Sequence, residues 1–197
     1  MKVLILFAHP AFHKSKVNKI MVDGLADMEG ITFHDLYEEY PDFNIDVKRE
    51  QELLSQHDVI IMQFPLFWYS TPAILKEWQD HVYEHGWAFG SKGVALKDKL
   101  FMCSITTGAP REAYKAGGFH NHTLPQLISP LQQSARLCKM ISMPPFVVHG
   151  SHSIEENEVR EHKKELMKLC DQFKNDRFDL EKAMSFEYMN DYLNEKG

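Results

Sequence analysis

The sequence predicts an α/β fold in which a doubly wound, five-stranded parallel sheet of order 2-1-3-4-5 carries helices on both faces. Short apolar runs alternate with segments of helical periodicity along the chain, which is typical of a parallel sheet covered by helices. The runs are continuous rather than alternating, as expected for strands buried on both faces. Parallel crossovers are right-handed, which leaves few topologies, and we choose this order among them.

Five apolar runs supply the predicted strands. The first reads KVLILFA and resembles the start of a signal peptide, but it is too short and no small-residue cleavage site follows. We therefore interpret it as a strand. In chain order, the predicted strands cover 2–8, 31–37, 58–64, 99–106 and 144–150.

Apolar residues at helical spacing fill the gaps between these strands. The first predicted helix covers 17–28, with Ser15 as its N-cap and Gly30 as its stop. The later predicted helices cover about 46–56, a segment that begins at Pro72, 124–140 and 155–174.

The chain length of 197 residues, 44% of them apolar, is enough for one well-cored domain. We place that domain at 1–175. The remaining segment, 176–197, is too apolar for a free end, so we expect it to pack on the domain or on a partner subunit.

Charge and cysteine content restrict the class of protein. The net charge is −6 and no basic cluster occurs, which disfavours binding to nucleic acid or to an anionic membrane. No apolar run is long enough for membrane insertion. Three scattered cysteines without a CxxC motif predict reduced thiols in a cytoplasmic protein.

Ligands of open parallel sheets bind beyond the carboxyl ends of the strands, where the strand order reverses. For the predicted order, that point lies between the first and third strands. The loops 9–18, 65–71 and 106–122 should meet there, and they have the most unusual compositions in the chain. This coincidence is the main argument from the residues for a binding site.

The first of these loops ends at a helix start, where backbone N–H groups suit an anion. His9, Ser15 and Asn18 could add side-chain donors, and ordinary capping by Ser15 is the alternative. The GxGxxG and GxxxxGK[ST] motifs are absent. A nucleoside triphosphate or a Rossmann-type dinucleotide is therefore not indicated.

The second loop, QFPLFWYSTP, places large rings where a strand should end in water. Pro65 and Pro72 stiffen it. Phe67, Trp68 and Tyr69 supply flat apolar surface that suits a planar aromatic ligand. The alternative is that these rings cap the core beneath the loop, and the residues alone leave both interpretations open.

The third loop offers hydroxyl and ring donors at Thr106, Thr107, Tyr114 and His120, and its glycines allow close backbone approach. Such donors can stabilise developing negative charge, although a flexible surface loop is the alternative. His81 and His85 share a helix face but have no third ligand at a diagnostic spacing, so no metal site is predicted.

Four segments together resemble the flavodoxin-like NAD(P)H:quinone oxidoreductases. They are QFPLFWYSTPAILKEWQDHVYEHGWAFG, AHP with a following Ser and Asn, LYEEYPDFNIDV and TTG. The similarity covers roughly 1–175 and is greatest to the bacterial branch, which includes the ancillary subunit of glutathione-regulated potassium efflux and the general-stress quinone reductases. It implies a flavodoxin-like fold, a tightly bound flavin and a homodimer with sites at the interface.

The resemblance also implies roles for individual residues. The matched positions on the flavin's phosphate and ribityl side are His9, Ser15, Val17 and Asn18. Those along the isoalloxazine ring are Pro65, Leu66, Phe67, Trp68 and Tyr69, and those at its pyrimidine edge are Thr106, Thr107 and Gly108. Tyr114 and His120 match the catalytic pair proposed to steady charge on the reduced ring.

Two departures affect the choice of flavin. The first loop is two residues longer than in the mammalian type, and Ala109 and Pro110 stand where that type has a second Gly after TTG. FMN and FAD therefore both stay open, and the shorter bacterial relatives favour FMN.

The implied activity is a two-electron, ping-pong NAD(P)H dehydrogenase (quinone). NAD(P)H gives a hydride to the flavin and leaves, and a quinone or similar flat aromatic acceptor then takes two electrons in the same cleft. The alternative is a flavin-binding regulatory subunit of a glutathione-gated potassium-efflux transporter. In that case the cytoplasmic protein would lie peripherally at the inner membrane. Azo- or nitro-reduction by the same flavin is a third option.

Overall fold

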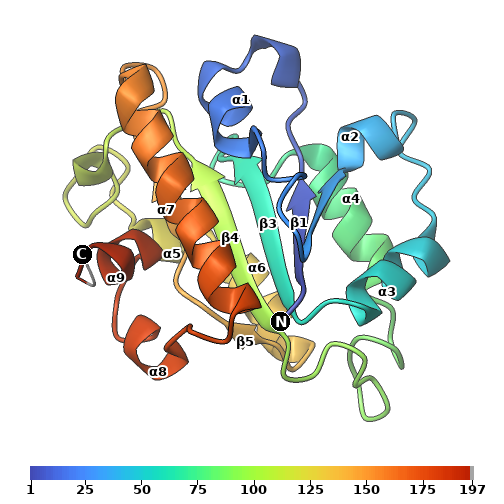
Figure 1. Ribbon diagram of the computed structural model, residues 1–197. Helices are drawn as coiled ribbons and strands as arrows, with labels where there is room; N and C mark the ends of the chain where they lie inside the picture. Colours follow the sequence, from blue (N-terminus) through green and yellow to red (C-terminus); the bar gives the residue numbers. More distant parts are fainter. Residues whose placement is uncertain (196–197) are drawn as a thin grey trace.

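The computed structural model describes residues 1–195 and is built around a parallel sheet in the order β2-β1-β3-β4-β5 (Figure 1). All the strand pairs are parallel. The strands are β1 (Val3–Phe7), β2 (Ile31–Asp35), β3 (Val59–Pro65), β4 (Leu100–Thr106), β5 (Ile141–Ser142) and β6 (Phe146–Val148). The predicted fold class and strand order are confirmed.

The fifth position of the sheet differs from its prediction, because two short strands share it. β5 pairs with the start of β4, whereas β6 pairs with the end of β4. Pro144 and Pro145 lie between them and lack the N–H groups that a continuous ladder needs. The predicted strand at 144–150 is therefore wrong at its start, since pairing begins at Ile141 and is interrupted.

The helices follow the predicted alternation, with two corrections. The helical elements are η1 (Phe12–Lys14), α1 (Lys16–Val22), α2 (Leu36–Glu39), α3 (Val47–Ser55), α4 (Ala73–Val82), η2 (Arg111–Ala113), α5 (Leu124–Leu127), α6 (Ser129–Leu137), α7 (Glu156–Lys174), α8 (Leu180–Ala183) and α9 (Met189–Glu195).

The first correction concerns α1, which ends at Val22 instead of 28 because Gly24 adopts a left-handed φ of 78°. Leu25 is nevertheless buried, so a turn can place it in the core without a helix. The second concerns the helix predicted at 124–140. It divides into α5 and α6, and Pro130 lies in the first turn of α6.

Alternate strand residues face opposite layers. Leu4 and Leu6 pack in a cluster with side chains of α3, α4 and α6, whereas Val3 and Ile5 pack in a cluster with side chains of α1 and α7. Figure 1 shows α1 and α7 crossing the near face of the sheet. The two clusters make one domain in which each helix layer covers one face.

A buried carboxylate links four elements on the α3–α4 face. Glu50 of α3 is fully buried; its Oε1 accepts hydrogen bonds from Tyr40 Oη at 2.5 Å and lies 2.9 Å from His34 Nε2. Its Oε2 accepts from Trp78 Nε1 at 2.7 Å. Burial alone would raise the pKa of Glu50, but these partners together lower it below its ordinary value. The cluster therefore joins β2, α2, α3 and α4 through one charge.

The C-terminal segment, residues 176–195, packs against the outer edge of β6. The Met189 N–H donates to the Pro145 carbonyl at 2.9 Å, and the Val147 N–H donates to Asn190 Oδ1 at 2.8 Å. Tyr192 is fully buried. The segment thus covers the exposed edge of the sheet, while the domain boundary at 175 stays a prediction.

Candidate functional site

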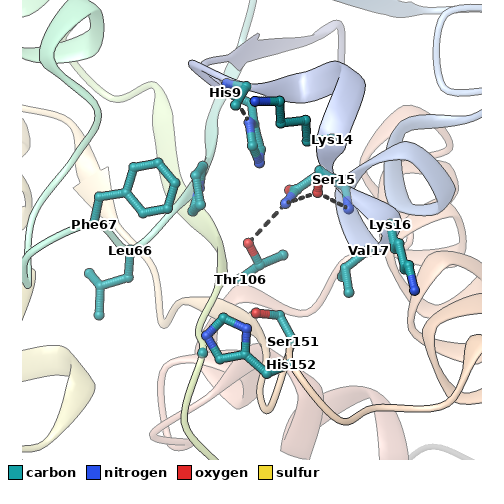
Figure 2. A pocket seen from close by; sticks show the side chains of 14 residues that line it. His9, Lys14, Ser15, Lys16, Val17, Leu66, Phe67, Thr106, Ser151 and His152 are labelled. Carbon is teal, nitrogen blue, oxygen red and sulfur yellow. Dashed lines mark hydrogen bonds between the residues drawn. The ribbon is translucent and has the colours of Figure 1, made fainter.

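A cavity of about 500 Å³ opens at the carboxyl ends of β1, β3 and β4 (Figure 2). The first, second and third loops of the sequence analysis all contribute to it, and so does the loop after β6. Its lining consists of His9, Ala11, Lys14, Ser15, Lys16, Val17, Asn18, Pro65, Leu66, Phe67, Thr106, Gly108, Ser151 and His152. The cavity therefore lies at the edge of the sheet where the strand order predicted a ligand.

Ser15 and Asn18 join the first loop to β4. The Ser15 hydroxyl oxygen caps α1, accepting from the Asn18 N–H at 3.1 Å and from Asn18 Nδ2 at 3.2 Å. Asn18 Nδ2 also donates to Thr106 Oγ1 at 3.1 Å. Asn18 Oδ1 is buried and has no hydrogen-bond partner among residues 1–195. It is an acceptor that a hydroxyl-bearing ligand could satisfy.

His9 adds a neutral donor to this side of the cavity. The Ala11 N–H donates to His9 Nδ1 at 3.1 Å, so the ring proton resides on Nε2. Burial lowers the pKa of His9 below its ordinary value. His9 is therefore uncharged near neutral pH and can offer Nε2–H to a ligand.

Two lysines supply the positive charge of the cavity. Lys14 and Lys16 flank Ser15 and line the same side of the cavity (Figure 2). Among residues 1–195, no acidic side chain lines this cavity. This side therefore suits an anionic group such as a phosphate.

The second loop lines the opposite side through Leu66 and Phe67 (Figure 2), and Pro65 also belongs to the lining. The backbones of Phe67 and Ser70 hydrogen-bond in both directions, at 3.0 and 2.9 Å. The two residues between them, Trp68 and Tyr69, have φ values of 49° and 63°, as in a type I′ turn. Bulky side chains rarely adopt this conformation, so the turn carries backbone strain.

This turn separates the three aromatic side chains that were predicted to form one flat surface. Phe67 faces the cavity, but Trp68 and Tyr69 do not line it, and Trp68 is 93% exposed. Tyr69 instead meets His120 of the third loop, with ring centroids 5.4 Å apart. The second and third loops therefore touch outside the cavity.

Tyr114 and His120 lie together, as the resemblance implies for a pair. Their rings stack with centroids 4.5 Å apart and an interplanar angle of 27°. They do not line the cavity, and neither does Thr107, which is buried and hydrogen-bonds to the Ala109 carbonyl. Burial raises the pKa of Tyr114 above its ordinary value, so its phenol stays protonated near neutral pH.

Ser151 and His152 line the cavity and were missed by the sequence analysis. They follow β6, whose carboxyl end lies at the same sheet edge. A Cβ on Gly108 would come within 2.7 Å of His152 Nε2, so glycine allows these two loops to close together. Their position directly after a strand was the signal available, but the predicted site included only the loops after the first, third and fourth strands.

Residues 1–195 contain no grouping of three His, Cys, Asp or Glu side chains suited to a metal ion. They also contain no helix that is both long and apolar enough to cross a membrane.

A protein-family model with a flavodoxin-like fold matches residues 1–169. Among curated proteins, the chain is 43% identical to an uncharacterized NAD(P)H oxidoreductase, YrkL, of Bacillus subtilis, over 81% of this chain and 92% of that protein. It is 42% identical to a glutathione-regulated potassium-efflux system ancillary protein, KefG, of Cronobacter sakazakii, over 82% of this chain and 88% of that protein.

Solved structures are also similar to this chain over most of its length. The general stress protein 14 of Treponema denticola, in complex with FMN, has a TM-score of 0.80 and 35% identity, covering 87% of this chain and 98% of that one. An NADPH-quinone reductase from P. pentosaceus has a TM-score of 0.77 and 31% identity, covering 88% and 97%. Fold and sequence similarity thus extend over most of each chain.

Proposed function

The chain belongs to the family with a flavodoxin-like fold, and from this premise we propose that it is an FMN-dependent NAD(P)H:quinone oxidoreductase. The observation that carries the proposal is the two-sided cavity at the reversal point of the sheet. One side presents lysines and hydroxyls, and the other presents Leu66 and Phe67. An NAD(P)H oxidoreductase and an NADPH-quinone reductase among similar proteins support this activity.

The residues present fit FMN. Lys14, Ser15 and Lys16 would hold its phosphate, since they offer positive charge and a hydroxyl. The unpartnered Asn18 Oδ1 would accept from a ribityl hydroxyl. Phe67 would lie along the flat ring, while Thr106 and Gly108 would meet its polar edge. The FMN complex of a 35% identical protein supports FMN over FAD.

When bound, FMN would accept a hydride from NAD(P)H and pass two electrons to the acceptor. The chain's own residues bind and orient the participants. Pro65 and Leu66 would exclude water from the flat apolar side of the cleft. Tyr114 keeps its phenolic proton near neutral pH because burial raises its pKa, and could donate it as a hydrogen bond to developing negative charge.

The same apolar slot suits a quinone as acceptor, or another flat aromatic molecule. NAD(P)H and the quinone would enter the same cavity one after the other, which is the basis of a ping-pong scheme. Trp68 and Phe119 are 93% and 88% exposed, and exposed rings of this size suit burial against a second copy of the chain. We therefore include a homodimer in the proposal.

A second candidate function is that of an ancillary subunit of a potassium-efflux transporter. The observation that favours it is the 42% identity to KefG. Such a subunit could retain the oxidoreductase activity and would lie at the membrane through its partner. Co-purification with a transporter, lost when the transporter is deleted, would support this role.

The experiment that tests the enzyme begins with the absorption spectrum of the purified protein and identification of any released flavin. We expect bound FMN, reduction by NADH or NADPH in the absence of quinone, and parallel lines in steady-state plots with benzoquinone. A colourless protein that takes up neither FMN nor FAD would overturn the proposal, and intersecting lines would overturn the ping-pong scheme.

A matched pair of variants tests the phosphate side. Lys16→Met removes a cavity charge and should weaken FMN binding by about tenfold. Lys76→Met removes a charge from the exposed face of α4, at a residue that does not line the cavity, and should leave FMN affinity unchanged. Equal affinities for the two variants would remove Lys16 from the site.

A further inference from the structure

The C-terminal segment, residues 176–195, is an addition to the common fold. The family model matches only residues 1–169. The segment is nevertheless well packed, since Tyr188, Met189 and Leu193 are buried. Hydrogen bonds from the backbone of Met189 and to the side chain of Asn190 fix it to the edge of the sheet. Its position relative to the sheet is therefore firmly determined.

Asp191 of this segment holds Arg111, which begins the turn before Tyr114. The two guanidinium nitrogens Nη1 and Nη2 each donate to a different carboxylate oxygen of Asp191, at 2.7 Å. The Arg111 guanidinium carbon also lies 4.5 Å from the centroid of the Tyr188 ring. A bidentate pair over an aromatic ring constrains orientation more than a single contact does.

Backbone hydrogen bonds connect the turn that begins at Arg111 to Tyr114 and His120. The Tyr114 N–H donates to the Arg111 carbonyl at 3.0 Å, and the His120 N–H donates to the Ala113 carbonyl at 3.0 Å. The backbone positions of Tyr114 and His120 therefore depend on the turn that Asp191 holds. Arg111 itself does not line the candidate flavin cavity.

A second route from the segment to Tyr114 passes through His149, which follows β6. The Tyr188 ring contacts the His149 ring edge-on, with centroids 5.8 Å apart. The His149 ring then contacts Tyr114 at 5.7 Å, and its Nδ1 lies 3.1 Å from Thr107 Oγ1. Tyr188 thus supports Tyr114 through the His149 ring, in addition to its contact with Arg111.

We propose that the C-terminal segment is a clamp that positions the Tyr114–His120 ring pair, with Asp191 acting through Arg111 and Tyr188 acting through His149. These are positioning residues, and their role in the reaction rests on the proposed function. Releasing the clamp should loosen the loop at 108–122. It should leave the loop at 9–18, on the other side of the cavity, unchanged.

The test uses full-length variants and hydrogen–deuterium exchange without added cofactor. Asp191→Asn keeps the shape of the side chain and loses the charged bidentate pair. Amides of 108–122 should then exchange about threefold to fivefold faster, the size expected for a partly exposed ion pair. The control is Asp23→Asn, which breaks another long-range pair, Asp23–Lys163, at 2.6 Å. It should leave exchange in 108–122 at the wild-type rate.

The second route has its own matched pair. Tyr188→Leu removes the ring beside Arg111 and His149, whereas Tyr188→Phe keeps it. Only the Leu variant should speed exchange in 108–122. Urea unfolding shows whether the Leu variant is folded, and Asp191→Asn tests the clamp on a partly exposed side chain if it is not.

Kinetics then separate positioning from general structure. With FMN bound, Asp191→Asn should lower kcat about threefold to fivefold while the FMN dissociation constant stays within about twofold. Asp191→Glu should recover part of the loss. Wild-type exchange in 108–122 for both Asp191→Asn and Tyr188→Leu would overturn the clamp. Failure of the wild-type protein to bind flavin would overturn the proposed function but not the exchange result.

Discussion

The Glu50 cluster and the carboxyl end of β3 both bury polar side chains, but their hydrogen bonding is opposite. Both oxygens of Glu50 have donors, supplied by Tyr40, His34 and Trp78. Gln63 of β3 is only 1% exposed, and neither its amide oxygen nor its amide nitrogen has a partner among residues 1–195. The two regions lie on one sheet and differ in how many of their buried polar atoms have hydrogen-bond partners.

The partners of Glu50 and the side chain of Gln63 lie on opposite faces of the sheet. Tyr40 and Trp78 belong to the cluster on the α3–α4 face. Gln63 continues the alternation of Val59 and Ile61, which pack on the α1–α7 face. Thr106 of β4 also hydrogen-bonds to α1 on that face. The comparison teaches that the satisfied Glu50 cluster holds the layers together, whereas Gln63, near the candidate site, is buried without a hydrogen-bond partner among residues 1–195.

The largest expected effect comes from breaking the satisfied region. Glu50→Ala leaves three buried donors without an acceptor. We expect it to lower the free energy of unfolding by about 3–5 kcal/mol. Urea denaturation measures this loss. Glu52→Ala, an exposed residue on the same helix, should change it by less than about 0.5 kcal/mol. A loss below about 1 kcal/mol for Glu50→Ala would mean that the cluster does not hold the layers.

His149 gives a pH-dependent effect of intermediate size. Burial, assisted by the charge of Arg111, lowers its pKa from 6.5 to about 4. In the unfolded chain, His149 therefore becomes protonated below about pH 6.5. In the folded chain it becomes protonated only below about pH 4. The free energy of unfolding should fall as pH drops through this range, by about 1–3 kcal/mol from this residue.

Urea denaturation at several pH values measures this fall, and His149→Gln supplies the comparison. The variant retains a neutral polar side chain and should lose this part of the pH dependence. As pH falls, the free energy of unfolding of the wild type should therefore decrease more than that of the variant. A difference that stays constant between about pH 7 and pH 4 would show that the His149 pKa is not lowered.

The smallest effect sharpens the comparison because its sign is reversed. Gln63→Leu removes a buried amide that has no partner, so we expect the flavin-free protein to gain about 1 kcal/mol in the free energy of unfolding. Thermal or urea unfolding measures the gain. Destabilisation by more than about 1 kcal/mol would place Gln63 with the satisfied polar groups, and the contrast between the two regions would fail.

Much of the fold was predictable because its signals are local. The alternation of short apolar runs, such as 2–8, with segments of helical periodicity predicted the sheet, and Ser15 was correctly predicted as the N-cap of α1. Helix ends were less predictable. Leu25 keeps helical spacing but reaches the core from a turn. The hydrophobic pattern indicates which side chains are buried, but it does not require that the backbone there be helical.

The site was predicted in outline. Strand order brought together the loops that contain Ser15, Phe67 and Thr106, and the family similarity agrees with the predicted resemblance. The roles assigned to individual residues stay predictions. Trp68 shows the limit, because a sequence signal for aromatic surface does not say which rings enter the cavity. That depends on a two-residue turn that points Trp68 into solvent.

The sequence by itself determined the alternation of strands and helices, the edge of the sheet where the candidate site lies and the absence of nucleotide-binding glycine motifs. These follow from side-chain pattern over short windows. Only the tertiary structure decided that Ser151 and His152 join the cavity and that Asp191 reaches Arg111, 80 residues away. Contacts at such separations depend on how the layers pack, and no local pattern encodes them.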